Sequence, residues 1–173
     1  MNHQKPLLWV DGYNVIFADS YLKELAQKDI LAAVGLLIEK VAEYAAFQGR
    51  QASIFFDRRD LAGPLQEEEY LGVRVLYGNQ QVSADTLMER MSGGLGSKPD
   101  IVLVTSDNLL KQILGGRLPL ARQMTALELL KELKNLPRQA ADRGTHPAKL
   151  ADALSGVARE YFRQKRYGER VML

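Results

Sequence analysis

The sequence predicts an α/β protein with a central, mainly parallel sheet of about four to five strands flanked by helices. Short, continuous apolar runs alternate along the chain with longer stretches that carry apolar residues at helical spacing. Uninterrupted apolar runs are typical of strands that are buried on both faces, as in a parallel sheet covered by helices. Strands that alternate with helices join into such a sheet through right-handed crossover connections.

Four apolar runs predict the main strands. They are bounded by proline, glycine or acidic residues and comprise residues 6–11, 51–57, 73–77 and 100–106. A shorter fifth strand is expected within 118–123. The segment 58–72 is polar and contains a Gly-Pro pair and three consecutive glutamates, so we predict a loop with a short helix there.

Helix start signals precede three of the predicted helices. Asp29, Ser83 and Thr125 stand at N-cap positions, and Glu128 completes a capping box with Thr125. The spacing of apolar residues predicts two further helices, over 108–114 and 148–166. The glycine pair Gly115-Gly116 is expected to end the helix over 108–114. The five predicted helices comprise residues 30–47, 84–91, 108–114, 126–136 and 148–166.

Composition fits an ordinary globular protein of one domain with a small C-terminal appendage. The 173 residues are 46% hydrophobic and 25% charged, with a net charge of +2. The sequence contains no cysteine, which excludes disulfides and thiolate metal sites and fits a cytoplasmic protein. No stretch approaches the ~20 apolar residues of a membrane span, so we expect no membrane partner.

We divide the chain into a domain of residues 1–137 and a basic linker with a C-terminal helix, residues 138–173. The C-terminal part carries eight Lys or Arg against four Asp or Glu. Basic tails often contact phosphate backbones, although a solvated helix face would have the same composition.

Four aspartates follow the predicted strands. Asp11, Asp57 and Asp107 come at the ends of three apolar runs, and Asp85 begins a predicted helix. The carboxyl ends of parallel strands line one crevice, where four carboxylates repel each other unless protonated or bound to a cation. Mg²⁺ and Mn²⁺ favour such all-oxygen sites. The pattern therefore predicts a metal-dependent enzyme that acts on phosphate esters.

The segment from Asp11 to Asn14 is the sharpest local signal. Gly12 is expected to let the chain turn with unusual dihedral angles, and Asn14 offers an amide that could bind a metal, a water or a phosphate oxygen. Tyr13 could stack on an unpaired base or pack under the sheet. An Asp-Gly pair is also common in simple turns.

The other candidates also have structural alternatives. Asp107, which follows Thr105 and Ser106, could serve only as the N-cap of the next helix. Asp57 could pair with the arginine that follows it. Glu89 lies four residues after Asp85, on the same helix face, and could assist it or form a surface ion pair.

Together these segments resemble the NYN family, a branch of the PIN-like nucleases, and in particular its YacP-like members. The resemblance covers residues 7–136, whereas Phe17-Ala18-Asp19 and the loop 93–99 match no motif. The matching segments are Leu8-Trp9-Val10-Asp11-Gly12-Tyr13-Asn14, Ile54-Phe55-Phe56-Asp57, Ser83-Ala84-Asp85 with Glu89, and Val104-Thr105-Ser106-Asp107.

The resemblance implies a PIN-like three-layer fold over residues 1–137 and a divalent-metal-dependent ribonuclease, most simply an endoribonuclease. It makes Asp11, Asp85 and Asp107 the ligands of Mg²⁺ or Mn²⁺, with Asn14 as a further catalytic residue. Asp57, Glu89 and Ser106 would be supporting groups. A catalytically silent RNA-binding or adaptor module on the same fold, or a small-molecule phosphohydrolase, remains an alternative.

The expected partner is RNA, either messenger RNA or ribosome-associated RNA. Arg58, Arg59 and Lys111 flank the predicted crevice and could hold backbone phosphates, or they could be ordinary solvated side chains. The glycine-rich segment 93–98 follows a helix and precedes a strand, which is the reverse of a phosphate-binding loop. We therefore expect no nucleotide cofactor.

Overall fold

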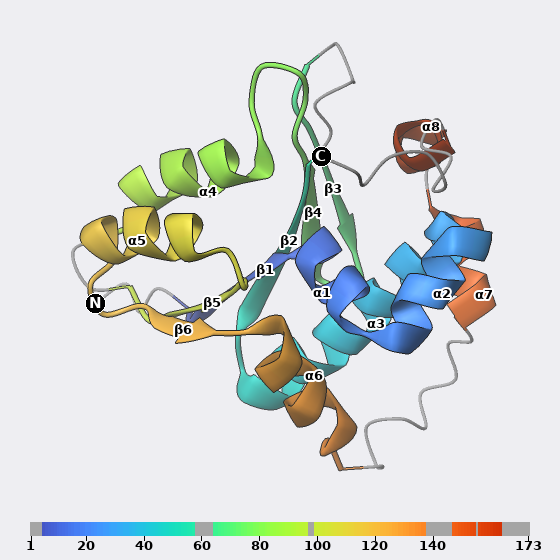
Figure 1. Cartoon of the computed structure of the whole chain (residues 1–173), viewed down its shortest axis with the longest axis horizontal. Helices are drawn as coiled ribbons and strands as arrows, with labels where there is room; N and C mark the ends of the chain where they lie inside the picture. The colour runs from blue at the N-terminus through green and yellow to red at the C-terminus, as the bar shows by residue number, and fades with distance from the viewer. Residues whose placement is uncertain (1–4, 58–63, 97–98, 138–146, 155, 164–173) are drawn as a thin grey trace.

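The structure is a computed structural model that describes residues 5–57, 64–96, 99–137, 147–154 and 156–163. Its centre is a six-stranded sheet with the strand order β3-β4-β2-β1-β5-β6 (Figure 1). All neighbouring strands are parallel except β3 and β4. The strands are β1 (Leu7–Asp11), β2 (Gln51–Phe56), β3 (Gln66–Tyr70), β4 (Val73–Tyr77), β5 (Ile101–Val104) and β6 (Arg122–Met124).

Helices cover both faces of this sheet and form the outer layers of a three-layer fold (Figure 1). One face carries α4 (Ala84–Gly93) and α5 (Asn108–Arg117). The other face carries α1 (Gly12–Ala18), α2 (Ser20–Lys28), α3 (Ile30–Gln48), α6 (Ala126–Lys134), α7 (Pro147–Ala153) and α8 (Gly156–Arg163). The predicted α/β class with a mainly parallel sheet is therefore confirmed.

The apolar strands supply two hydrophobic cores because successive side chains point to opposite faces of the sheet. Leu8 and Val10 of β1 belong to the larger core, under α1, α3 and the helices beside them. Trp9 belongs to the smaller core, under α4 and α5. Strand β1 pairs with β2 on one side and β5 on the other, so its last residue, Asp11, lies at the middle of the sheet's carboxyl edge.

The edge strand β3 differs from the loop and short helix predicted for residues 58–72. Its three consecutive glutamates alternate between exposed and half-buried positions, which is the period of a strand, although glutamate is depleted in strands. Glu67 pairs with Arg74 at 2.5 Å, and Glu68 accepts hydrogen bonds from the hydroxyls of Tyr70 and Tyr77. A charged edge strand is protected against pairing with other chains.

The segment after Asp11 forms two helices that the sequence analysis did not predict, α1 and α2. Asp19 separates them in an extended conformation and caps α2 by accepting a hydrogen bond from the backbone N–H of Leu22 at 2.8 Å. The predicted caps at Asp29, Ser83 and Thr125 are confirmed, as is the capping box. The glycine pair does not end α5, which continues to Arg117.

The single helix predicted over 148–166 is two helices, α7 and α8. The Arg159 guanidinium donates to the backbone carbonyls of Ala151, Asp152 and Leu154, so it closes the end of α7 where the chain turns. Buried residues of both helices join the larger core: Leu150, Leu154, Ala158, Tyr161 and Phe162. The division at residue 137 stays a prediction, but α7 and α8 share the core formed by the rest of the chain.

Within the described residues, none of the helices combines the length and apolar character needed to cross a lipid bilayer.

Candidate active site

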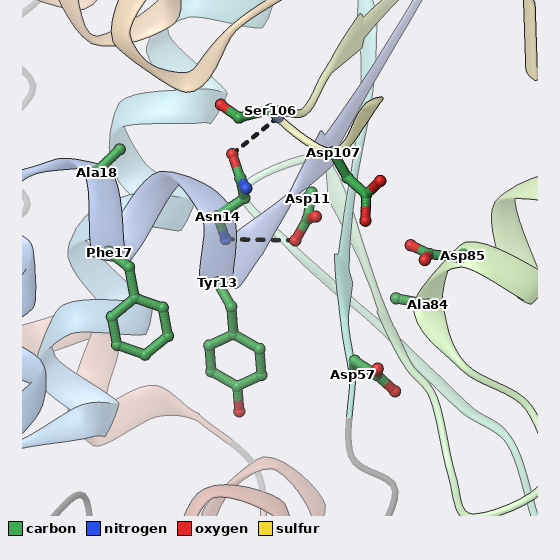
Figure 2. A pocket seen from close by; sticks show the side chains of 10 residues that line it. All are labelled: Asp11, Tyr13, Asn14, Phe17, Ala18, Asp57, Ala84, Asp85, Ser106 and Asp107. Carbon is green, nitrogen blue, oxygen red and sulfur yellow. Dashed lines mark hydrogen bonds between the residues drawn. The ribbon is translucent and has the colours of Figure 1, made fainter. Parts of the chain in front are cut away.

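A pocket of about 850 Å³ lies at the carboxyl edge of the sheet, where β1, β2 and β5 end (Figure 2). It contains seven of the residues singled out in the sequence, and Phe17, Ala18 and Ala84 complete its lining. The seven are Asp11, Tyr13, Asn14, Asp57, Asp85, Ser106 and Asp107. The fold therefore brings together side chains from four segments spread over almost a hundred residues.

Asp11 is the last residue of β1 and the N-cap of α1. Its Oδ1 accepts a hydrogen bond from the backbone N–H of Asn14 at 3.3 Å, and its Oδ2 accepts one from the Thr105 hydroxyl at 3.5 Å. Burial raises the pKa of Asp11 from 3.8 to about 6. The two hydrogen bonds oppose this rise in the pKa, whereas the negative charges of Asp85 and Asp107 add to it.

Asp107 is both the N-cap of α5 and part of the pocket. Its Oδ1 accepts hydrogen bonds from the backbone N–H groups of Leu109 at 2.8 Å and Leu110 at 3.1 Å. The cap considered as an alternative in the sequence analysis is therefore present. The second carboxylate oxygen takes no part in these two bonds, and in Figure 2 the carboxylate lies on the side facing Asp85. Asp107 can therefore cap α5 through Oδ1 and bind a ligand in the pocket through Oδ2.

Thr105 links Asp11 to the backbone of Asp107, a positioning role that the sequence analysis did not assign to it. It is fully buried at the end of β5. Its hydroxyl accepts a hydrogen bond from the backbone N–H of Asp107 at 3.1 Å and donates to Asp11. In the sequence, Thr105 is the first polar residue after the apolar run of β5, which is the only signal that marked it.

Asn14 joins the start of α1 to the loop before α5. Its Oδ1 accepts a hydrogen bond from the backbone N–H of Ser106 at 3.0 Å (Figure 2). This bond turns the oxygen toward Ser106 and leaves the amide N–H groups to donate elsewhere. This arrangement suits a phosphate oxygen better than a metal ion.

Asp85 and Asp57 approach the pocket from the side opposite Asn14 (Figure 2). Asp85 lies in the first turn of α4, which begins at Ser83, an N-cap that accepts from the backbone N–H of Thr86 at 3.1 Å. Asp57 directly follows β2. Both side chains are half-buried. The α4 cap fixes the turn that carries Asp85, so this carboxylate is held by regular secondary structure rather than by a loop.

Other predicted residues do not line the pocket. Glu89 forms an ion pair with Arg117, at 2.7 Å between Oε1 and Nη2, which links α4 to α5. Lys111 lies on α5 outside the pocket lining. Arg58 and Arg59 lie outside the described residues.

Gly12 has a different role from the one the sequence suggested. It is the first residue of α1 and does not belong to the glycines with a positive φ. A Cβ atom at this position would lie 2.4 Å from Cε1 of Phe56, well inside a van der Waals contact. Glycine is therefore required by the close approach of α1 to the end of β2.

The donor atoms around this pocket suit a hard divalent cation. Among the residues that the structure describes, no three acidic or histidine side chains already form a group that could hold a metal. Asp11, Asp85 and Asp107 nevertheless reach the pocket from three elements and offer only oxygen atoms, the ligands preferred by Mg²⁺ and Mn²⁺. A cation would relieve the repulsion that adds to the raised pKa of Asp11.

Comparison with known proteins decides the family. The family model described as "YacP-like NYN domain" matches residues 8–167. The chain belongs to the YacP-like NYN family. The match extends through α7 and α8, beyond the region that carried the resemblance in the sequence. The four pocket aspartates of this NYN domain all fall inside the match.

Relatives from Bacillus subtilis agree with this assignment. The NYN domain is 30% identical over 134 residues to "Uncharacterized protein YacP" of strain 168, a match that covers 77% of this chain and 78% of the relative. The crystal structure of Rae1 (YacP) from the same species is 28% identical and has a TM-score of 0.64 over 94% of this chain and 95% of that one. The crystal structure of a Rae1 mutant, 24% identical, matches with a TM-score of 0.63 over 91% and 98%. The chain therefore has the PIN-like, nuclease-like fold of these proteins.

Proposed function

We propose that this NYN domain is a divalent-metal-dependent endoribonuclease that hydrolyses phosphodiester bonds of RNA with Mg²⁺ or Mn²⁺. The observation that carries the proposal is the meeting of Asp11, Asp85 and Asp107 in one open pocket, where their like charges help to raise the pKa of Asp11. Membership of the NYN family and the nuclease-like fold support it.

The three aspartates would hold the cation, and two of them are oriented by hydrogen bonds. The backbone N–H of Asn14 and the Thr105 hydroxyl orient Asp11, and the α5 cap orients Asp107. A divalent ion bound there would polarise the scissile phosphate and lower the pKa of a water that attacks it.

The remaining polar groups act on the substrate. The amide nitrogen of Asn14 can donate to a phosphate oxygen, and the bond from the Ser106 backbone to its oxygen fixes the orientation of the amide. Asp57 lines the same pocket and could accept a hydrogen bond from the attacking water. The pocket is open to solvent, as a site for a polymer requires.

The test is cleavage of a set of single-stranded and structured RNAs in Mg²⁺, in Mn²⁺ or in EDTA. We expect cleavage that needs the metal and is lost in Asp11→Asn and Asp85→Asn. A matched control is Asp29→Asn, which also changes an N-cap aspartate but lies on the surface at the start of α3, outside the pocket. Cleavage that survives in Asp11→Asn, or that persists in EDTA, would refute the proposal. RNA binding without cleavage under any of these conditions would support the silent binding module instead.

We further propose that the RNA is messenger RNA or ribosome-associated RNA, met in the cytoplasm. The basic residues after residue 137 would contact such an RNA. Deleting that whole segment would not test their contribution to RNA binding, because α7 and α8 supply part of the core. Arg159 is also unsuited, since its guanidinium closes α7. A better variant is the double substitution Lys165→Glu and Arg166→Glu. We expect it to weaken RNA binding and to flatten the dependence of affinity on salt by about two phosphate contacts.

A further inference from the structure

We propose that Phe17 is the residue on which an unpaired nucleobase of the substrate stacks, with Tyr13 as its support. The ligand is a base one or two nucleotides from the phosphate that enters the aspartate pocket. The inference rests on the proposed action on RNA and assigns the stacking role first considered for Tyr13 to its neighbour one helical turn away.

Phe17 and Tyr13 lie side by side on α1, at the edge of the pocket away from Asp85 (Figure 2). Their ring centroids are 6.0 Å apart and their planes differ by 21°, which is a stacked arrangement. Tyr13 is half-buried, whereas 42% of the Phe17 surface is exposed. Both rings line the pocket, and Phe17 is the more exposed of the two, so it offers the larger accessible surface to a base.

The support behind this pair consists of buried aromatic rings. Tyr13 packs edge-on against Phe56, with centroids 5.2 Å apart. Phe56 in turn packs against Phe162 of α8 at 5.1 Å and stacks with Tyr77 of β4 at 6.4 Å. A ring held from behind in this way loses little conformational freedom when a base binds, so more of the stacking energy contributes to affinity.

The position of Phe17 relative to the aspartates fits a polynucleotide. Phe17 lies six residues after Asp11 along a helix, and a helix rises about 1.5 Å per residue, so the two positions are about 9 Å apart along the axis. A base whose own or neighbouring phosphate occupies the pocket can reach this distance. Stacking on an aromatic ring requires a base that is not already stacked in a duplex, which favours single-stranded RNA.

Exposure alone would not support this inference, because exposed apolar side chains are common on protein surfaces. Phe47, at the end of α3, is 58% exposed and Tyr21 on α2 is 63% exposed. Neither of them lines the pocket. Phe17 differs from both in lining the aspartate pocket and stacking on a second ring there, and Phe47 therefore provides a matched control.

The test is a double-mutant cycle between the protein and the RNA. A short, labelled single-stranded RNA is bound by the wild-type protein in EDTA, and a series of the same RNA carries one abasic residue at each position in turn. We expect Phe17→Ala to lower the affinity for intact RNA by about 5- to 140-fold, the range for losing one stacked base. Phe17→Trp should restore the affinity, and Phe47→Ala should leave it unchanged.

The decisive result is the energetic coupling between the Phe17→Ala substitution and the abasic residue in the RNA. At one position, the abasic residue should weaken binding to the wild type and have little further effect on Phe17→Ala. Additive losses at every position, or wild-type affinity in Phe17→Ala, would overturn the inference. Binding of the intact RNA that is too weak to measure in the wild type would overturn it as well.

The binding cycle and the cleavage assay, carried out on the same protein, distinguish failure of the stacking site from failure of the proposed function. Coupling at one position without cleavage in any metal would support the stacking site and refute the nuclease. Metal-dependent cleavage with purely additive binding losses would support the nuclease and refute the stacking site.

Discussion

Asp11→Asn should stabilise the protein at neutral pH in the absence of a metal, even though it removes a residue of the proposed active site. The pKa of Asp11 rises from 3.8 to about 6 on folding, first because the carboxylate is buried and then because Asp85 and Asp107 repel it. Each pKa unit corresponds to about 1.4 kcal/mol, so ionised Asp11 lowers the free energy of unfolding by about 3 kcal/mol.

The sign of the pH dependence follows from the direction of this pKa change. Below about pH 3, Asp11 is protonated in both the folded and the unfolded chain, and its folded form carries no penalty. As the pH rises from about 4 to 6, the unfolded chain releases the proton that the folded protein still holds, so stability is lost over this range and the loss is complete above pH 6. Asparagine carries no charge and is an equally good N-cap, so the bond to Asn14 can be kept.

The measurement is urea denaturation of wild type and Asp11→Asn in EDTA at several pH values between about 3 and 8. The difference in the free energy of unfolding should be near zero at about pH 3 and should approach about 3 kcal/mol in favour of the variant above about pH 7. Asp29→Asn shows what the loss of an N-cap carboxylate does by itself. Added Mg²⁺ should narrow the difference by binding to the folded wild type. A difference that does not change with pH, or a variant less stable than the wild type at pH 8, would refute the reasoning.

Two further predictions concern the packing beside the pocket. Gly12→Ala should destabilise the protein by about 1–3 kcal/mol in urea denaturation, because its Cβ would lie 2.4 Å from a ring atom of Phe56. Gly116→Ala, where a Cβ meets open space within α5, should be neutral or stabilising by up to about 1 kcal/mol, and equal effects of the two would contradict the packing argument. Tyr161→Phe should lower the free energy of unfolding by about 1 kcal/mol, because the Tyr161 hydroxyl donates to the Phe56 carbonyl at 3.1 Å and this carbonyl keeps its second bond, from Gly78. A wild-type denaturation midpoint for Tyr161→Phe would show that this buried bond contributes nothing.

The sheet and the location of the site could be predicted because they depend on local signals. Apolar runs that end in an aspartate mark parallel strands, and parallel strands bring their ends to one edge. The segment that includes Phe17 could not be placed, since α1 is short and its start at Gly12 resembles a turn. The edge strand β3 was missed because its three glutamates suggest a solvated loop, although two of them are paired by Arg74 and two tyrosines.

Roles within the site were harder to predict than its position. Whether Asn14 offers an oxygen or N–H groups depends on the Ser106 backbone, 92 residues away. Glu89 has the spacing for a partner of Asp85, yet Arg117 on the neighbouring helix pairs with it. Such choices between competing partners are made by tertiary contacts that no sequence spacing records.

The contact between α8 and Phe56 also determines when the pocket can form during synthesis. Phe56 lies against Tyr13 on one side and Phe162 on the other, and its carbonyl is bound by Tyr161. Because synthesis runs from the N-terminus, Tyr13 is made well before α8. A nascent chain that stops before α8 lacks the back of the aromatic stack, so the support behind Tyr13 is completed only after α8 has been made. An RNA-cleaving site built in this way would be withheld until α8 has joined the fold.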